Sequence, residues 1–141
     1  MQVKQISIFL ENRVGRLQEV ADVLTKNEIN IRALSLADTS DFGILRLIVN
    51  KPDEATEILR GSGFTVREND VIAAEVEDRP GGLARILGLF SSGDISVEYM
   101  YAFSEAETGR AALIFRFDDP GSAVEHLNEA GINVFADVGL G

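Results

Sequence analysis

The sequence predicts an α+β protein made of two copies of a βαββαβ unit, each an antiparallel sheet with its helices on one face. Two observations lead to this prediction. Similar segments recur at a fixed distance along the 141-residue chain, and the spacing of apolar residues within each copy alternates between strand-like and helix-like. A hydrophobic content of 45% and a charged content of 26% are typical of a globular chain rather than a disordered one.

The internal repeat is clearest at two loops, Asn12-Arg13-Val14-Gly15-Arg16-Leu17 and Asp78-Arg79-Pro80-Gly81-Gly82-Leu83. A shift of 66 positions aligns them, and a shift of 68 aligns the chain beyond Phe117. The alignment also pairs apolar and turn positions: Ile6 with Ile72, Ile29 with Ile95, Gly43 with Gly109, Pro52 with Pro120, Gly63 with Gly131 and Val66 with Val134. We therefore expect one module at residues 1–69 and a second at residues 70–141, joined at a turn-prone pair, Asn69-Asp70.

Each copy is predicted to begin with a strand and a helix. Apolar side chains alternate with others over residues 5–10, which is strand spacing. From Leu17, and again from Leu83, apolar residues follow at i+3, i+4 and i+7, which predicts one amphipathic helix per copy. We expect these helices to end at Asn27 and Gly93, because asparagine and glycine best tolerate the left-handed backbone of a helix cap.

Two strands, a helix and a last strand are predicted to complete each copy. Pro52 and Pro120 mark the helix starts, where a proline loses no needed donor, and Asp119 is a candidate N-cap. The strands are expected at residues 29–36, 44–49 and 64–67 of the first copy, and at 95–103, 111–117 and 132–136 of the second. Asp38-Thr39-Ser40-Asp41 is predicted to be a simple polar turn.

The faces of the two sheets are expected to differ. Because the handedness of the crossovers is fixed, both helices of a copy must cover the same face. The opposite face of the first copy carries Phe9, Ile44 and Ile48, so we expect a partner sheet or helix to cover it. Tyr99, Tyr101 and Phe103 share one face at strand spacing; packing at an interface is favoured over a wall for an apolar ligand or partner.

Charge and composition exclude several classes of protein. Thirteen basic against 23 acidic residues give a net charge of −10, which argues against nucleic-acid binding and against docking on an anionic membrane. Cysteine is absent and His126 is the single histidine, so cysteine-based and histidine-rich metal sites are excluded, and we expect no cofactor. His126 aligns with Ile58, which favours a partly buried, hydrogen-bonded histidine over a general base. With no signal-like or membrane-spanning apolar segment, a soluble cytoplasmic protein is expected.

The loops at 12–17 and 78–83 carry the chemistry that the sequence offers. Gly15, Gly81 and Gly82 remove side chains where a helix begins, so a ligand could reach bare N–H groups at the positive end of the helix dipole. Such a site suits a carboxylate or a phosphate, although the glycines could equally serve only a tight turn. The lysine of a phosphate-binding loop is missing. Arg13 and Arg79 could pair with a carboxylate or remain solvated surface charges.

The segment 78–87, Asp-Arg-Pro-Gly-Gly-Leu-Ala-Arg-Ile-Leu, resembles the strand-to-helix signature of the ACT domain, a small amino-acid-sensing regulatory module. Residues 12–17 are a looser match, with Val14 where the family usually has proline. Gly-Asp-Ile-Ser-Val at 93–97, echoed by residues 27–31, adds to the resemblance, which extends over nearly the whole chain. It implies a ferredoxin-like fold with strand order 4-1-3-2, and a protein that consists of two ACT modules without a catalytic domain.

The resemblance also implies a ligand and its contacts. An amino acid would lie where two modules meet, with its carboxylate at a helix start and its ammonium group against Asn, Asp or backbone carbonyls. The implied ligand-binding residues are Asn12, Arg13, Val14, Gly15, Arg16, Leu17, Asn30, Ile31, Asp78, Arg79, Pro80, Gly81, Gly82, Leu83, Ser96 and Val97. We expect a non-catalytic, allosteric sensor that forms a homodimer and regulates a partner enzyme of amino-acid or related metabolism.

Two other functions are compatible with the order of elements. Arg13 beside Asn12 could act on a phosphoryl group as in a small acylphosphatase-like hydrolase, but the fuller pattern of that family is missing. The strand at residues 109–117 weakly resembles that of an RNA-recognition motif. The net charge and the lack of aromatic residues at 44–49 argue against RNA binding.

Overall fold

The computed structural model describes residues 3–38, 42–105 and 110–135. The chain divides into two compact units. One comprises Lys4–Asn69, and the other is formed chiefly by the residues from Asp70 onward. We refer to them as the first and second modules, and describe each by itself.

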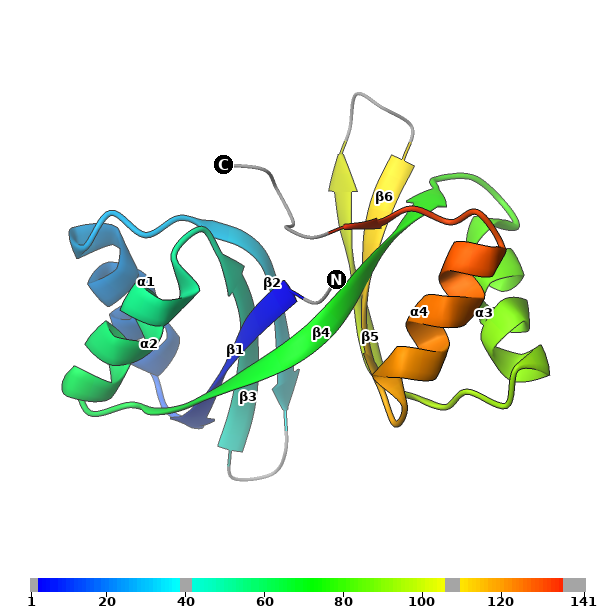
Figure 1. The fold of residues 1–141 in the computed structure, drawn as a ribbon. Helices are drawn as coiled ribbons and strands as arrows, with labels where there is room; N and C mark the ends of the chain where they lie inside the picture. Colours follow the sequence, from blue (N-terminus) through cyan, green and yellow to red (C-terminus); the bar gives the residue numbers. More distant parts are fainter. Residues whose placement is uncertain (1–2, 39–41, 106–109, 136–141) are drawn as a thin grey trace. The chain divides into compact units, whose positions relative to one another are not determined.

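The first module has the element order that its sequence predicts. Its sheet has the strand order β4-β1-β3-β2, and β3 runs antiparallel to both β1 and β2. Helices α1 and α2 lie together on one side of this sheet (Figure 1). The elements are β1 (Val3–Glu11), α1 (Arg16–Lys26), β2 (Ile31–Asp38), β3 (Phe42–Val49), α2 (Pro52–Gly61) and the first part of β4 (Thr65–Glu77).

The second module repeats this arrangement. Its sheet has the order β7-β4-β6-β5, with antiparallel pairing throughout. Its elements are the second part of β4, then α3 (Gly82–Ser92), β5 (Val97–Glu105), β6 (Arg110–Phe117), α4 (Pro120–Glu129) and β7 (Val134–Phe135). Both sheets therefore have the order 4-1-3-2 within their own copy, which confirms the predicted pair of ferredoxin-like βαββαβ modules.

Each core lies between the helices and one face of the sheet. In the first module, alternate residues of β1 (Ile6, Ile8 and Leu10) pack against Val20 and Leu24 of α1. Burial of such side chains contributes about 1.5–3 kcal/mol each. The core of the second module is aromatic: Phe90 of α3 meets Phe115 and Phe117 of β6 edge-to-face, with ring centroids 5.1 and 4.8 Å apart.

The other sheet face of the first module is partly apolar, as predicted. Phe9 and Ile44 lie opposite each other in the β1–β3 register and are half-buried, whereas Ile48 is 1% exposed. Tyr99, Tyr101 and Phe103 likewise share the helix-free face of their sheet, and all three are half-buried. That a partner sheet or helix, within the chain or across a dimer, covers such a face stays a prediction.

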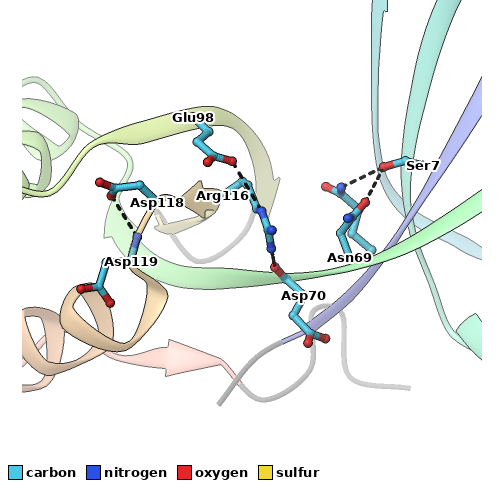
Figure 2. A network of polar contacts seen from close by, with 8 residues as sticks. Ser7, Asn69, Asp70, Glu98, Arg116, Asp118 and Asp119 are labelled. Carbon is cyan, nitrogen blue, oxygen red and sulfur yellow. Dashed lines mark hydrogen bonds and ion pairs between the residues drawn. The ribbon is translucent and has the colours of Figure 1, made fainter.

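The predicted turn at Asn69-Asp70 is wrong, because β4 continues through both residues. In the first module the Ser7 hydroxyl donates to Oδ1 of Asn69 at 3.0 Å, and in the second the Arg116 guanidinium donates to the carbonyl of Asp70 at 2.8 Å (Figure 2). These partners lie 62 and 46 residues away. The turn propensity of Asn-Asp is a local preference, and tertiary hydrogen bonds override it.

The helix caps differ from the prediction by one residue. Asn27 and Gly93 have negative φ, and the left-handed residues are Glu28 (φ 56°) and Asp94 (φ 57°). The N–H of Ile29 donates to the carbonyl of Leu24 at 2.9 Å, the bond of a Schellman cap, in which the residue after the cap residue is left-handed.

Tertiary packing supplies another reason for glycine at residue 93. A β-carbon there would lie 2.6 Å from Nε2 of His126. The ring of His126 is half-buried, and its Nδ1 lies 2.8 Å from the carbonyl oxygen of Ser122. This contact confirms the expected hydrogen-bonded, structural histidine.

Other local predictions are confirmed. Pro52 and Pro120 open α2 and α4, and the Asp119 side chain accepts from the Ser122 N–H at 3.1 Å.

In the described part of the chain, each helix is too short or too polar to cross a membrane. Part of the predicted turn at 38–41, and Ala136 of the last predicted strand, lie outside the described residues.

Candidate functional site

A pocket of about 430 Å³ lies at one end of the second module. The end of β4, the loop into α3, the start of β6 and the loop before β7 form its walls. Its lining residues are Glu75, Val76, Glu77, Arg79, Pro80, Gly81, Gly82, Arg85, Ile86, Arg110, Gly131, Ile132 and Asn133. A pocket of this size is large enough for a small metabolite.

Gly81 and Gly82 of this pocket are required to be glycine for different physical reasons. Gly81 has φ +90°, a left-handed conformation that residues with a side chain rarely adopt. Gly82 starts α3, and a β-carbon there would lie 2.1 Å from the carbonyl oxygen of Glu77. The loop is closed by two backbone hydrogen bonds, from Arg79 to Glu77 (2.9 Å) and from Gly82 to Arg79 (3.0 Å). No side chain caps α3, so the first-turn N–H groups have no side-chain partner.

Charged groups of both signs line the pocket. The Glu75 carboxylate accepts from Arg110 at 2.6 Å and from the Asn133 amide at 3.1 Å. These hydrogen bonds, that of Arg110 first, hold the pKa of Glu75 below its usual value of 4.5. Arg79 forms a close ion pair with Glu77. The Arg85 side chain has no hydrogen bond or ion pair within the described residues, so its guanidinium is available to an anion.

The loop of the first module has a left-handed glycine at the same position but different surroundings. Gly15 has φ +87°, and no side chain caps α1. Val14 is fully exposed, and Nε of Arg13 lies 3.5 Å from the Glu11 carboxylate. The nearby carboxylate argues against a phosphoryl group on Arg13, as an acylphosphatase-like site would require.

Arg16, the first residue of α1, does not point into open solvent. Its guanidinium carbon lies 4.3 Å from the centroid of the Phe64 ring, and its Nη1 lies 2.6 Å from the carboxylate of Glu19. The side chain is 18% exposed. In the alignment of the two copies, Arg16 corresponds to Gly82 and Phe64 to Ile132, and both of these residues line the pocket of the second module.

The predicted ligand-binding residues do not form one group within a module. Four of them, Arg79, Pro80, Gly81 and Gly82, line the pocket, whereas Asp78 and Leu83 are exposed beside it. Leu17 is also exposed, at 48%, and Asn12 is exposed in the same loop of the first module.

The residues that open the second strand of each copy lie far from the loop. The loops and these strand starts are at opposite ends of helices α1 and α3, each 11 residues or about 16 Å long. Asn30 and Ser96 donate through their N–H groups to side chains of Asn50 (3.0 Å) and Asp118 (3.2 Å). Ile31 and Val97 pack against the edges of the two cores.

Sequence reasoning missed the polar residues that line the rest of the pocket. Glu75, Arg85, Arg110 and Asn133 come from four separate segments. The internal repeat contains a signal that could have found them: the corresponding residues of the first copy are Phe9, Glu19, Ile44 and Thr65, so charge has replaced apolar character, or has changed sign, at three of the four positions.

Comparison with known protein families identifies the fold that carries the pocket and the loops. A family model described as an ACT domain pair matches residues 1–140. The chain therefore belongs to the ACT domain pair family. Within the described residues, no group of three or more acidic or histidine side chains could hold a metal ion.

Solved structures of similar fold extend over almost the whole chain. Protein BT0572 from Bacteroides thetaiotaomicron is 41% identical, with a TM-score of 0.91 over 96% of this chain and 92% of that one. The ligand-free regulatory subunit of aspartate kinase from Thermus thermophilus is 16% identical, with a TM-score of 0.65 over 90% and 91% of the two chains. The regulatory subunit of aspartate kinase from Thermus flavus is also 16% identical, with a TM-score of 0.62 over 91% of this chain and 92% of that one. No curated protein sequence matches significantly.

Proposed function

We propose that the protein is a non-catalytic sensor that binds an amino acid and regulates a partner enzyme of amino-acid metabolism. One observation carries this proposal: the second module has a pocket of about 430 Å³ in which guanidinium and carboxylate groups face the uncapped start of a helix. A free amino acid carries one charge of each sign at neutral pH, so the pocket is complementary to it.

The charged groups suggest how a zwitterion would be held. Its carboxylate would meet Arg85 and the first N–H groups of α3, where the helix dipole favours a negative charge. Its ammonium group would meet the Glu77 carboxylate, which has one ion-pair partner, Arg79, and therefore keeps acceptor capacity for a ligand; Asp78 lies next in the chain. Glu75 is held in place by Arg110 and Asn133, so it would shape the wall rather than turn toward the ligand.

We propose the boundaries 1–69 and 70–141 for the two modules, and a homodimer as the functional unit. The edge strand β2 exposes Leu34 and Leu36, at 58% and 51%. Exposed apolar residues on an edge strand favour pairing with another chain. In such a dimer, residues Asn30, Ile31, Ser96 and Val97 would reach a ligand of the other copy. Sedimentation of the purified chain at twice the monomer mass would support this assembly.

The regulatory subunits of the two Thermus aspartate kinases share this fold. At 16% identity they do not indicate which amino acid or which enzyme concerns this chain. The proposed sensing role depends on the pocket. The proposal that the protein regulates an enzyme on a separate polypeptide extends that sensing role.

Calorimetric titration of the full chain with each of the twenty L-amino acids tests the proposal. We expect one amino acid, or a few similar ones, to bind. Replacing Arg85 by glutamate, the residue of the first copy, should abolish that binding because Arg85 is exposed and free to pair. Lys26→Glu makes the same change of charge on α1 and should bind normally. A chain that binds none of the twenty would contradict the proposal.

A further inference from the structure

We infer that the two modules have different roles: the second binds the amino acid, whereas the first has its corresponding space filled by its own Arg16. The inference deepens the proposed function and rests on it. It concerns how many ligand molecules one chain takes and which residue decides this.

Arg16 lies where the second module has a residue that borders the pocket. In the second module, Gly82 and Ile132 border the pocket from two different loops. The residues aligned with them in the first module are Arg16 and Phe64, and the Arg16 guanidinium lies over the Phe64 ring at 4.3 Å. A long side chain therefore extends between the two loops that, in the second module, border the pocket from a glycine and an isoleucine.

The Arg16 side chain is held in place by two kinds of contact. Its Nη1 pairs with Glu19 at 2.6 Å, and 18% of the side chain is exposed. A guanidinium stacked on an aromatic ring and paired with a carboxylate is held at its face and at one of its edge nitrogens. The contacts keep the side chain in place even though its Nε is buried without a hydrogen-bond partner in the described chain. A ligand would have to displace all of them.

The first module also lacks the polar wall of the second module's pocket. The Glu75–Arg110 ion pair of the second module corresponds to Phe9 and Ile44 in the first. These two residues lie opposite each other in the β1–β3 register, so an apolar pair has replaced a charged one. Glu19 stands where Arg85 would meet a carboxylate. The first module therefore lacks both the free arginine and the charged wall that the second module offers to a zwitterion.

The test is the number of amino-acid molecules bound per chain, measured by calorimetry on the full protein with the twenty L-amino acids as probes. We expect one molecule per chain. Arg85→Glu should remove it, and Arg16→Gly, which copies Gly82 into the first module, should leave its affinity unchanged within twofold. Circular dichroism of each variant checks that it is folded, and Arg16→Ala serves as a second variant because alanine preserves the helix start.

The outcomes separate this inference from the proposed function. Two molecules per unaltered chain would overturn the inference and leave amino-acid sensing intact. A tenfold or greater loss of affinity in folded Arg16→Gly and Arg16→Ala would also overturn it, because Arg16 would then be a ligand contact. A second molecule that binds only when Arg16 is removed would support it. If none of the twenty binds the unaltered chain, the proposed function fails and the inference fails with it.

Discussion

The first and second modules share their left-handed backbone positions and differ in what surrounds their leading loops. Left-handed residues recur at aligned positions, Gly15 with Gly81 and Glu28 with Asp94. Yet only the second module has glycine at the first helical residue after the loop, where the first has Arg16. The comparison teaches that turns and caps of a duplicated fold can persist while the chemistry at one end of the sheet diverges.

The cores differ as well, although the architecture does not. Leu24 of α1 aligns with Phe90 of α3, and Val49 of β3 aligns with Phe115 of β6. The second module has an aromatic cluster where the first has aliphatic side chains. Both patterns fill the space between helices and sheet, because a core tolerates different side chains if its volume and its apolar pattern are kept.

The largest expected effect concerns these cores. Phe90→Ala should lower the free energy of unfolding by about 3–5 kcal/mol, because it leaves a cavity between two aromatic rings. Phe90→Leu, which copies the first module, should cost roughly 1 kcal/mol through the lost ring contacts. Urea denaturation measures both. Equal losses for the two variants would contradict a specific contribution from the aromatic pairs.

The second prediction addresses the leading loops directly. Gly81→Asp should weaken amino-acid binding by at least about a hundredfold, or ~2.7 kcal/mol, because it adds a negative charge where the ligand carboxylate would lie. Gly15→Asp imposes the same left-handed backbone strain on the first module. It should leave binding unchanged. Calorimetry on the two folded variants measures the contrast, and normal binding by both would show that neither loop holds the ligand.

The third prediction concerns helix glycines. Gly82→Ala should destabilise the protein by about 1–3 kcal/mol, since its β-carbon would meet the Glu77 carbonyl oxygen at 2.1 Å. Gly88, in the middle of α3, has open space around it. Gly88→Ala should therefore stabilise the protein by about 0.5–1 kcal/mol. Thermal unfolding shows whether each variant is less or more stable than the unaltered chain. A Gly82→Ala variant as stable as the unaltered chain would contradict the prediction, because the loop could then shift to make room for the β-carbon.

The smallest expected effect is a pH dependence limited to the second module. The pKa of Glu75 is lowered in the folded protein by Arg110 and Asn133. Its contribution to stability is therefore present above the unfolded pKa, near 4.5, and is lost as the pH falls through the lower folded pKa. Glu75→Gln should reduce the loss of stability between pH 5 and strongly acidic solution.

The first module has Phe9 at the aligned position, which cannot titrate. Urea unfolding at several pH values measures the difference between the unaltered chain and Glu75→Gln. An NMR titration in which the Glu75 carboxyl has a pKa above 4.5 would contradict the prediction.

The sequence alone was sufficient to predict the internal repeat, the order of the helices and strands, and the position of both leading loops. These features depend on local chemistry: apolar periodicity chooses strand or helix, Pro52 and Pro120 open helices, and glycines permit turns. The left-handed positions Glu28 and Asp94 escaped prediction by one residue, because Asn27 and Gly93 just before them have the higher intrinsic preference for a left-handed backbone.

Only the tertiary structure decided that Asn69-Asp70 belongs to a strand, that Arg16 folds back onto Phe64, and that Glu75, Arg110 and Asn133 meet at one pocket. Each of these outcomes joins residues from separate segments of the chain. Local preferences say nothing of such partners, because their proximity depends on how strands pair and how helices pack over them. The residues that distinguish the two modules are therefore readable in the sequence, whereas their meeting at one end of a sheet is a property of the fold.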